Sequence, residues 1–297
     1  MSDTGAWGFT DDRGVALTAA RTPERVVAYV RAGAALLDLG VTPVAVYGSG
    51  HDGDVIDPVK AGGLEAAGVL YLGPGRSLDE QVLRELRPDL VVDVTYDGKS
   101  PYALDEAVAD RLGVPSAALC VGNELMLPTI IGRFGALAAA LRPTSTVASP
   151  GPGSGLTSGP GPGTGSATDS LASAEEALRV AAGRTDVAVL ALSGAGSDQV
   201  HLARPHAWPE LARLLELGAR LLEPGQGPGA NWLTADWEHA ARLAPDLVLF
   251  DSRANAMAPD AFPPVGHARV APWNPEIPPS PAAYARFFHA VAEALDA

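Results

Sequence analysis

Two segments of this chain share one pattern of polar and hydrophobic residues. Each begins at an aspartate, Asp79 or Asp236, and reaches a proline nine residues later, reading DEQVLRELRP and DWEHAARLAP. Each proline precedes Asp-Leu-Val and a short apolar run, LVVDV or LVLF. Aspartate favours a helix N-terminus, proline marks a helix end, and a short, partly β-branched apolar run is typical of a buried strand. Both segments therefore predict a helix, a turn and a strand.

A second pair of similar segments supports two related halves. LLDLG at 36–40 precedes VTPVAVYG, and LLELG at 214–218 precedes ARLLEPG, each typical of a helix that ends at glycine and leads into a strand. RVVAYV at 25–30 and DVAVLAL at 186–192 suit the first strand of each half. The repeated order predicts two Rossmann-like α/β lobes with mostly parallel sheets. Ligands of such sheets bind outside the carboxyl ends of the strands.

The boundaries between the lobes follow from composition. Residues 148–169 are rich in glycine and proline and predict a flexible loop, and 170–184 read as one helix. We therefore expect an N-terminal lobe over 1–147 and a C-terminal lobe over 185–297. A single long helix between lobes is a stiff connector, so we expect only small lobe motions.

Charge and cysteine content exclude several classes of function. The net charge is −14 and no basic stripe is present, which argues against nucleic acid. The lone cysteine, Cys120, excludes an internal disulfide and a multi-cysteine metal site. None of the histidines forms an HxH or HExxH pattern, so we expect no metal site built directly from side chains.

The chain offers no signal for a membrane. No apolar run reaches the roughly 18 residues that a spanning helix needs. The first residues, MSDTGAWGFTDDRG, lack the basic and apolar regions of a signal peptide. As the chain stands we expect a cytoplasmic protein, or an extracytoplasmic one if a leader was removed.

The order of several segments resembles one known family. WGFTDDRGVALTAARTPERVVAYV, LLDLGVTPVAVYG, the two PDLV units and WNPEIPPSPAAYARFFHAVAEAL occur in that order. This arrangement is similar to that of the substrate-binding proteins of ABC importers for ferric siderophores and cobalamin. The resemblance covers nearly the whole chain apart from the Gly/Pro-rich loop. It implies a class III periplasmic-binding-protein fold with the ligand held between the lobes.

The resemblance also implies site residues in the N-terminal lobe. In hydroxamate-siderophore binders an arginine lies before the first PDLV helix and a tyrosine follows the next strand; here these are Arg76 and Tyr96. A ferric hydroxamate presents partly negative oxygens, which suit a guanidinium and a phenol as donors. We add Tyr47, at the end of VAVY, as a further ligand contact.

In the C-terminal lobe we expect aromatic walls. Trp232 and Trp273 lie in predicted loops, and aromatic side chains help a cleft to hold an organic chelate. Arg253 follows the second PDLV strand, where Tyr96 follows the first. We therefore include all three in the ligand site.

The resemblance further implies docking on an ABC permease through one acidic residue per lobe. In the second lobe this residue is Glu238. In the first lobe Gln81 stands at the matching position, with Glu80 beside it, so we assign Glu80. We expect a monomer that binds a metal chelate and holds no tightly bound cofactor.

Two alternatives remain open. Cobalamin or haem would suit the same fold, since one axial tyrosine or histidine suffices for haem. An enzyme or metabolite binder recruited from this fold is the other, although no nucleophile elbow or phosphate loop is present. The sequence therefore favours a binding protein for a ferric siderophore over a catalyst.

Overall fold

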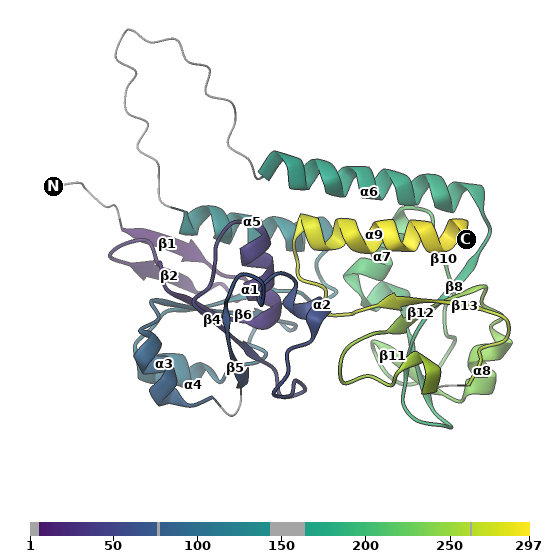
Figure 1. Cartoon of the computed structure of the whole chain (residues 1–297), viewed down its shortest axis with the longest axis horizontal. Coiled ribbons are helices and arrows are strands. Elements are labelled where there is room, and N and C mark those ends of the chain that lie inside the picture. The colour runs from purple at the N-terminus through teal and green to yellow at the C-terminus, as the bar shows by residue number, and fades with distance from the viewer. Residues whose placement is uncertain (1–5, 76–77, 143–163, 262) are drawn as a thin grey trace, which may run out of the picture.

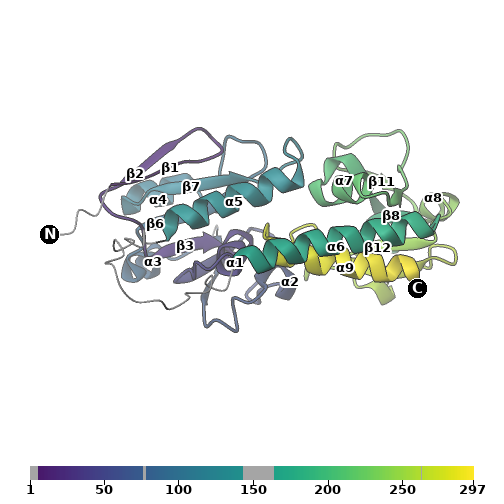
Figure 2. The same ribbon diagram turned by 90° about the horizontal axis from the view of Figure 1, so that it is seen from above.

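The protein consists of two α/β lobes and a pair of long helices that run alongside them (Figure 1). The computed structural model describes residues 6–75, 78–142, 164–261 and 263–297. Helices α6 (Thr164–Arg184) and α9 (Pro281–Asp296) lie side by side in both views (Figures 1 and 2). The predicted architecture of two lobes with one long helix between them is confirmed.

The sheet of the N-terminal lobe is entirely parallel and has the order β5-β4-β3-β6-β7. Its strands are β3 (Val26–Tyr29), β4 (Ala45–Gly48), β5 (Leu70–Pro74), β6 (Leu90–Thr95) and β7 (Ser116–Cys120). The helices of this lobe are α1 (Val30–Asp38), α2 (Pro58–Ala61), α3 (Glu80–Leu86), α4 (Glu106–Leu112) and α5 (Leu127–Leu141). An antiparallel hairpin, β1 (Trp7–Thr10) and β2 (Ala16–Ala19), precedes them.

The sheet of the C-terminal lobe is mixed. Its order is β11-β9-β8-β12-β13, with β10 also paired to β8, and β9 runs antiparallel to both neighbours. Its strands are β8 (Ala188–Gly194), β9 (Val200–Ala203), β10 (Arg220–Leu221), β11 (Trp232–Ala235), β12 (Leu247–Asp251) and β13 (Arg269–Trp273). Helices α7 (Pro209–Glu216) and α8 (Trp237–Arg242) and the short turns η2 (Pro205–Ala207) and η3 (Pro259–Ala261) complete the lobe.

Both PDLV segments form the predicted helix, turn and strand. Asp79 caps α3 by accepting a hydrogen bond from the Gln81 amide at 2.8 Å, and Asp236 caps α8 by accepting one from the His239 amide at 2.6 Å. The following strands, β6 and β12, are almost wholly buried. They occupy central positions in their sheets, which explains their continuous apolar sequence.

Helix α6 begins at Thr164, six residues before the expected start at residue 170. No proline lies between residues 163 and 204, so nothing in the sequence stops the helix from extending backward. Leu178 of α6 and Phe288 of α9 are both fully buried in one core cluster. Burial of these faces anchors the connecting helix to the C-terminal lobe.

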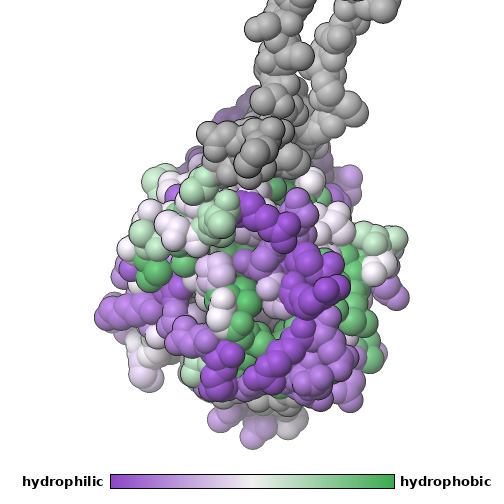
Figure 3. Space-filling view, turned by 90° about the vertical axis from the view of Figure 1, so that its left-hand side faces the viewer, coloured by the Kyte–Doolittle hydropathy of each residue, from purple (hydrophilic) through white to green (hydrophobic). Residues whose placement is uncertain are grey.

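The outer end of the N-terminal lobe is mainly hydrophilic, with smaller apolar areas between the polar ones (Figure 3). This distribution agrees with the acidic composition. None of the described helices is long and apolar enough to cross a membrane.

Candidate ligand-binding cleft

The carboxyl ends of strands β3, β6 and β7 of the N-terminal lobe point toward the interface between the lobes. Arg31 follows β3, Tyr96 follows β6 and Asn123 follows β7, while Trp208 and Asn231 approach from the other lobe. Together with Glu210 they line a cavity of about 180 Å³. Asn123 and Asn231 are exposed, so the cavity opens to solvent. This is the position at which parallel α/β sheets bind ligands.

Tyr96 forms the wall of the cavity on the N-terminal lobe. Its ring packs edge-on against Tyr102 at 4.9 Å, and Arg31 Nη1 donates a hydrogen bond to its hydroxyl at 3.3 Å. Burial raises the pKa of the Tyr96 hydroxyl, while Arg31 acts in the opposite direction. The phenol therefore keeps its proton at neutral pH. Because the oxygen already accepts from Arg31, that proton is free to be donated to a ligand.

Arg31 also joins the two lobes. The side chain is only 3% exposed, and its Nε donates to the carbonyl oxygen of Ile277 at 2.9 Å. It stands at the start of α1, directly after the buried strand β3, so its backbone is rigidly held. Arg31 therefore fixes the Tyr96 hydroxyl relative to the C-terminal lobe.

Trp208 lines the opposite side of the cavity and packs in a cluster with two other tryptophans. The ring centres of Trp208 and Trp232 lie 4.9 Å apart, and Trp273 lies 5.4 Å from Trp208 and 5.8 Å from Trp232. Trp273 is 1% exposed and donates from Nε1 to Glu210 Oε1 at 3.1 Å. Trp208 and Trp232 are partly exposed. The outer two rings can thus meet a ligand, and Trp273 supports them from below.

Charged side chains deeper in the interface are paired with one another. Lys60 is 3% exposed and contacts Asp52 at 2.6 Å and Glu276 of the other lobe. Arg253 Nη2 lies 2.6 Å from Asp251 Oδ2. Both of these cations have a carboxylate partner, whereas Arg31 forms no ion pair among the described residues.

The structure separates the residues predicted for the site into two groups. Tyr96 lines the cavity between the lobes, Trp232 packs against Trp208 of that cavity, and Arg253 follows β12 and pairs with Asp251. Tyr47 is fully buried, donates to Asp93 Oδ2 at 3.1 Å, and so cannot touch a ligand in this conformation. Trp273 is buried in the same way, because β13 packs its end beneath Trp208 and Trp232. Arg76 lies outside the described residues.

The two acidic residues predicted for docking differ in their surroundings. The Glu238 side chain is 88% exposed and contacts only Arg242 at 3.5 Å among the described residues. Glu80 is 29% exposed and pairs with both Arg84 and Arg111. Glu238 is therefore the more available for a partner.

Sequence reasoning missed several residues at the interface. Arg31 is the one charged residue in the otherwise apolar start of the helix VRAGAALL, and Glu276 lies between two prolines in NPEIPP. A charge enclosed by apolar or rigid sequence is a signal of a buried side chain with polar partners. Lys60, within DPVKAGG, carried no comparable signal.

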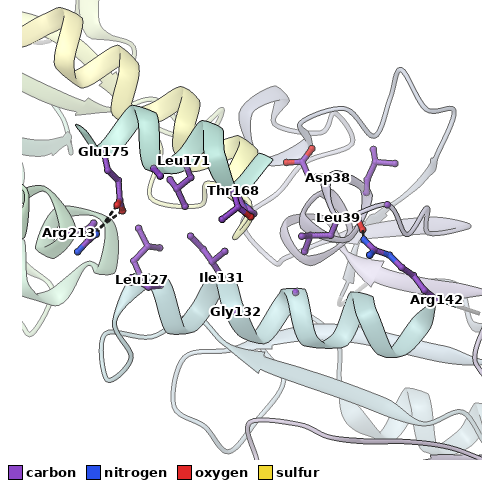
Figure 4. Close-up of a pocket in the computed structure, with 16 residues that line it drawn as sticks. Asp38, Leu39, Leu127, Ile131, Gly132, Arg142, Thr168, Leu171, Glu175 and Arg213 are labelled. Carbon is purple, nitrogen blue, oxygen red and sulfur yellow. Dashed lines mark hydrogen bonds and ion pairs between the residues drawn. The ribbon is translucent and has the colours of Figure 1, made fainter. Parts of the chain in front are cut away.

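A larger cavity of about 890 Å³ lies away from this cleft, beneath α6 and between α1 and α5 (Figure 4). Its lining is mainly aliphatic, including Leu127, Ile131 and Leu171. Its ion pair, Arg213 with Glu175, is already bidentate, with both Nε and Nη2 at 2.9 Å from a carboxylate oxygen. Among the described residues, the small interlobe cleft places polar side chains beside aromatic rings, with Tyr96 and Trp208 in its lining.

The described residues contain no group of three or more histidine, cysteine, aspartate or glutamate side chains that could hold a metal ion.

Comparison with known proteins identifies the fold. No protein-family model matches the chain, and no curated protein matches it by sequence. Among solved structures, DesE, a ferric-siderophore receptor protein from Streptomyces coelicolor, matches with a TM-score of 0.80, 25% identity and coverage of 98% of both chains. The chain has the fold of the ferric-siderophore-binding proteins. The resemblance predicted from the sequence is thereby confirmed.

More distant structures share the same fold. VctP, a catecholate-siderophore-binding protein from Vibrio cholerae, matches at a TM-score of 0.64 and 11% identity over 98% of this chain and 99% of that one. The haem-binding protein RhuT from Roseiflexus sp. RS-1 matches at 0.60 and 14%, over 92% and 98%. The class III periplasmic-binding-protein fold therefore extends to proteins that bind chemically different ligands.

Proposed function

We propose that this chain binds a ferric siderophore of the hydroxamate type in the cleft between its lobes. The observation that carries this proposal is the Tyr96 hydroxyl, which accepts from Arg31 and faces a cavity with Trp208 on its other side. The phenol proton suits the partly negative oxygens around a chelated iron. The indoles suit the apolar spacers of the chelator.

The charge balance of the cleft favours a hydroxamate over a catecholate. Three hydroxamates neutralise Fe³⁺, whereas three catecholates leave three negative charges on the complex. Lys60 and Arg253 are paired with neighbouring carboxylates, so Arg31 is the cation at the cavity that forms no ion pair among the described residues. Holding a trianion would require several unpaired cations because desolvating that charge is costly. A neutral chelate needs only the donors and the aromatic surface.

The size of the cavity limits how the chelate lies. About 180 Å³ is less than the roughly 300–1,000 Å³ of typical ligand pockets. The chelate therefore sits at the mouth of the cleft, near the exposed Asn123 and Asn231, with a small separation of the lobes. Because Arg31 and Lys60 are buried between the lobes, we expect the lobes to move only slightly on binding and not to undergo a wide closure.

Titration of tryptophan fluorescence with a ferric trihydroxamate tests the site. Tyr96→Phe removes one hydrogen bond and should weaken binding by about 3- to 10-fold. Tyr71→Phe is the matched control, because the Tyr71 hydroxyl donates to the Gly53 carbonyl oxygen outside the cavity. Equal affinity of wild type and Tyr96→Phe would show that the chelate binds elsewhere.

We further propose that the protein acts as a monomer and delivers the chelate to an ABC permease, with Glu238 and Glu80 meeting cationic residues of that permease. The exposed Glu238 supports this. Glu238→Lys should lower the uptake rate in cells while leaving chelate affinity unchanged. Glu293→Lys, on the exposed face of α9, is the control. Normal uptake by the Glu238 variant would contradict the docking role.

A further inference from the structure

One arginine binds three carbonyl groups of a glycine-rich loop in the C-terminal lobe. Residues 223–231, which connect β10 to β11, form no regular secondary structure and are mostly exposed. Arg204 donates from Nε to the Gly229 carbonyl oxygen at 3.0 Å, from Nη1 to Gly225 at 2.9 Å and from Nη2 to Gly227 at 2.9 Å. One guanidinium therefore binds three alternate carbonyl groups of the loop.

The backbone of the loop is shaped for this contact. Gly225, Gly227 and Gly229 all have positive φ, at 95°, 154° and 97°. A Cβ atom on Gly229 would lie 2.1 Å from the Trp232 carbonyl oxygen, and one on Gly227 would lie 2.3 Å from a Leu233 methyl group. Only glycine fits these positions, and such a sequence loses much conformational entropy when it is ordered.

The loop leads directly into the tryptophan wall. Asn231, at its end, lines the cavity between the lobes, and its carbonyl oxygen accepts from the Arg204 amide at 2.9 Å and from Trp208 Nε1 at 3.2 Å. Trp232 follows immediately and packs on Trp208. By holding the loop, Arg204 thus helps to fix the positions of Trp208 and Trp232.

We infer that Arg204 is a positioning residue that holds the 223–231 loop as a preformed rim of the ligand cleft. This inference rests on the proposed function, because it assigns the rim to the site where the chelate binds. A planar guanidinium is needed, since its donors point in fixed directions toward three carbonyls at once, which a lysine ammonium cannot match. Ordering the loop before binding removes an entropic cost from association.

Arg204→Lys tests the inference, with Arg220→Lys as the matched control. Arg220 lies in the same lobe, its side chain is 54% exposed, and it donates to the Asp186 carbonyl oxygen away from the cleft. In Arg204→Lys we expect unchanged far-ultraviolet circular dichroism and faster hydrogen exchange confined to the peptide covering 223–231. We also expect an altered near-ultraviolet signal from the Trp208–Trp232 pair and about 10-fold weaker binding of a ferric trihydroxamate.

Chemical rescue separates positioning from general stability. Methylguanidinium added to Arg204→Ala should restore both the near-ultraviolet signal and part of the affinity, whereas methylammonium should not. The inference would be overturned if the 223–231 peptide of Arg204→Lys exchanged hydrogen at the wild-type rate. It would also be overturned if that exchange were faster while the affinity for the ferric trihydroxamate stayed unchanged. If wild type binds no ferric chelate while the loop still loosens in the variant, the proposed function fails and the structural role of Arg204 stands.

Discussion

Asp93 is a fully buried carboxyl group beneath the cleft. It accepts hydrogen bonds from the Leu104 amide at 2.9 Å, from the Ala103 amide and from the Tyr47 hydroxyl. Burial raises its pKa from 3.8 to about 6, although these hydrogen bonds oppose the rise. The folded state therefore holds this proton to a higher pH than the unfolded state does.

The raised pKa of Asp93 makes the stability of the protein depend on pH. Because the folded state binds more protons between pH 4 and 6, the free energy of unfolding falls as pH rises through this window. A shift of about two pKa units corresponds to about 3 kcal/mol. Asp93→Asn should remove this contribution, so the difference in unfolding free energy between variant and wild type changes by about that amount from pH 4 to pH 6.5. If urea denaturation gives the same difference in unfolding free energy between Asp93→Asn and wild type at both pH values, the assignment is wrong.

At the scale of elements, the two PDLV units also share a backbone feature that the sequence did not reveal. Arg87 and Ala244, each directly before the proline, are the described non-glycine residues with positive φ, at 46° and 51°. The sequence predicted the helix and the strand because helix N-caps and buried strands strongly prefer particular residue types. The left-handed residue between them was not predicted, since neither arginine nor alanine signals that conformation.

This geometry predicts an unusual response to glycine. Ala244→Gly relieves the left-handed strain and should raise the unfolding free energy by up to about 1 kcal/mol, less the greater entropy of the unfolded chain. Ala241→Gly, inside helix α8, should lower it by about 1 kcal/mol. Thermal unfolding of both variants measures the contrast, and equal destabilisation by the two would show that Ala244 is not strained.

At the scale of the whole molecule, contacts between distant parts of the chain hold the lobes together. Lys60 meets Glu276, and Asp57 accepts from the Ala254 amide at 2.7 Å and from Asn274. No local pattern could predict these pairings, because they depend on how two lobes dock. The same holds for Trp273: the sequence marked it as aromatic and near the site, but only the packing of β13 shows that it lies beneath the surface.

Breaking the contact between the lobes should be costly. Lys60→Met leaves Asp52 and Glu276 buried without their cation, and we expect a loss of about 3–5 kcal/mol in unfolding free energy. Arg179→Met, which removes an exposed pair with Glu176, should cost less than about 1 kcal/mol. Chemical denaturation compares them. A loss at Lys60 as small as that at Arg179 would mean that the lobes do not depend on this pair.

One series of fluorescence titrations identifies the ligand class. Wild-type protein is titrated with a ferric trihydroxamate, a ferric tris-catecholate, haem, cobalamin and the iron-free chelators. We predict saturable quenching by the ferric trihydroxamate, with binding of the catecholate weaker by at least about 10-fold. Tighter binding of the trianionic catecholate or of haem, or no binding of any ferric chelate, would contradict the proposed ligand and the charge argument behind it.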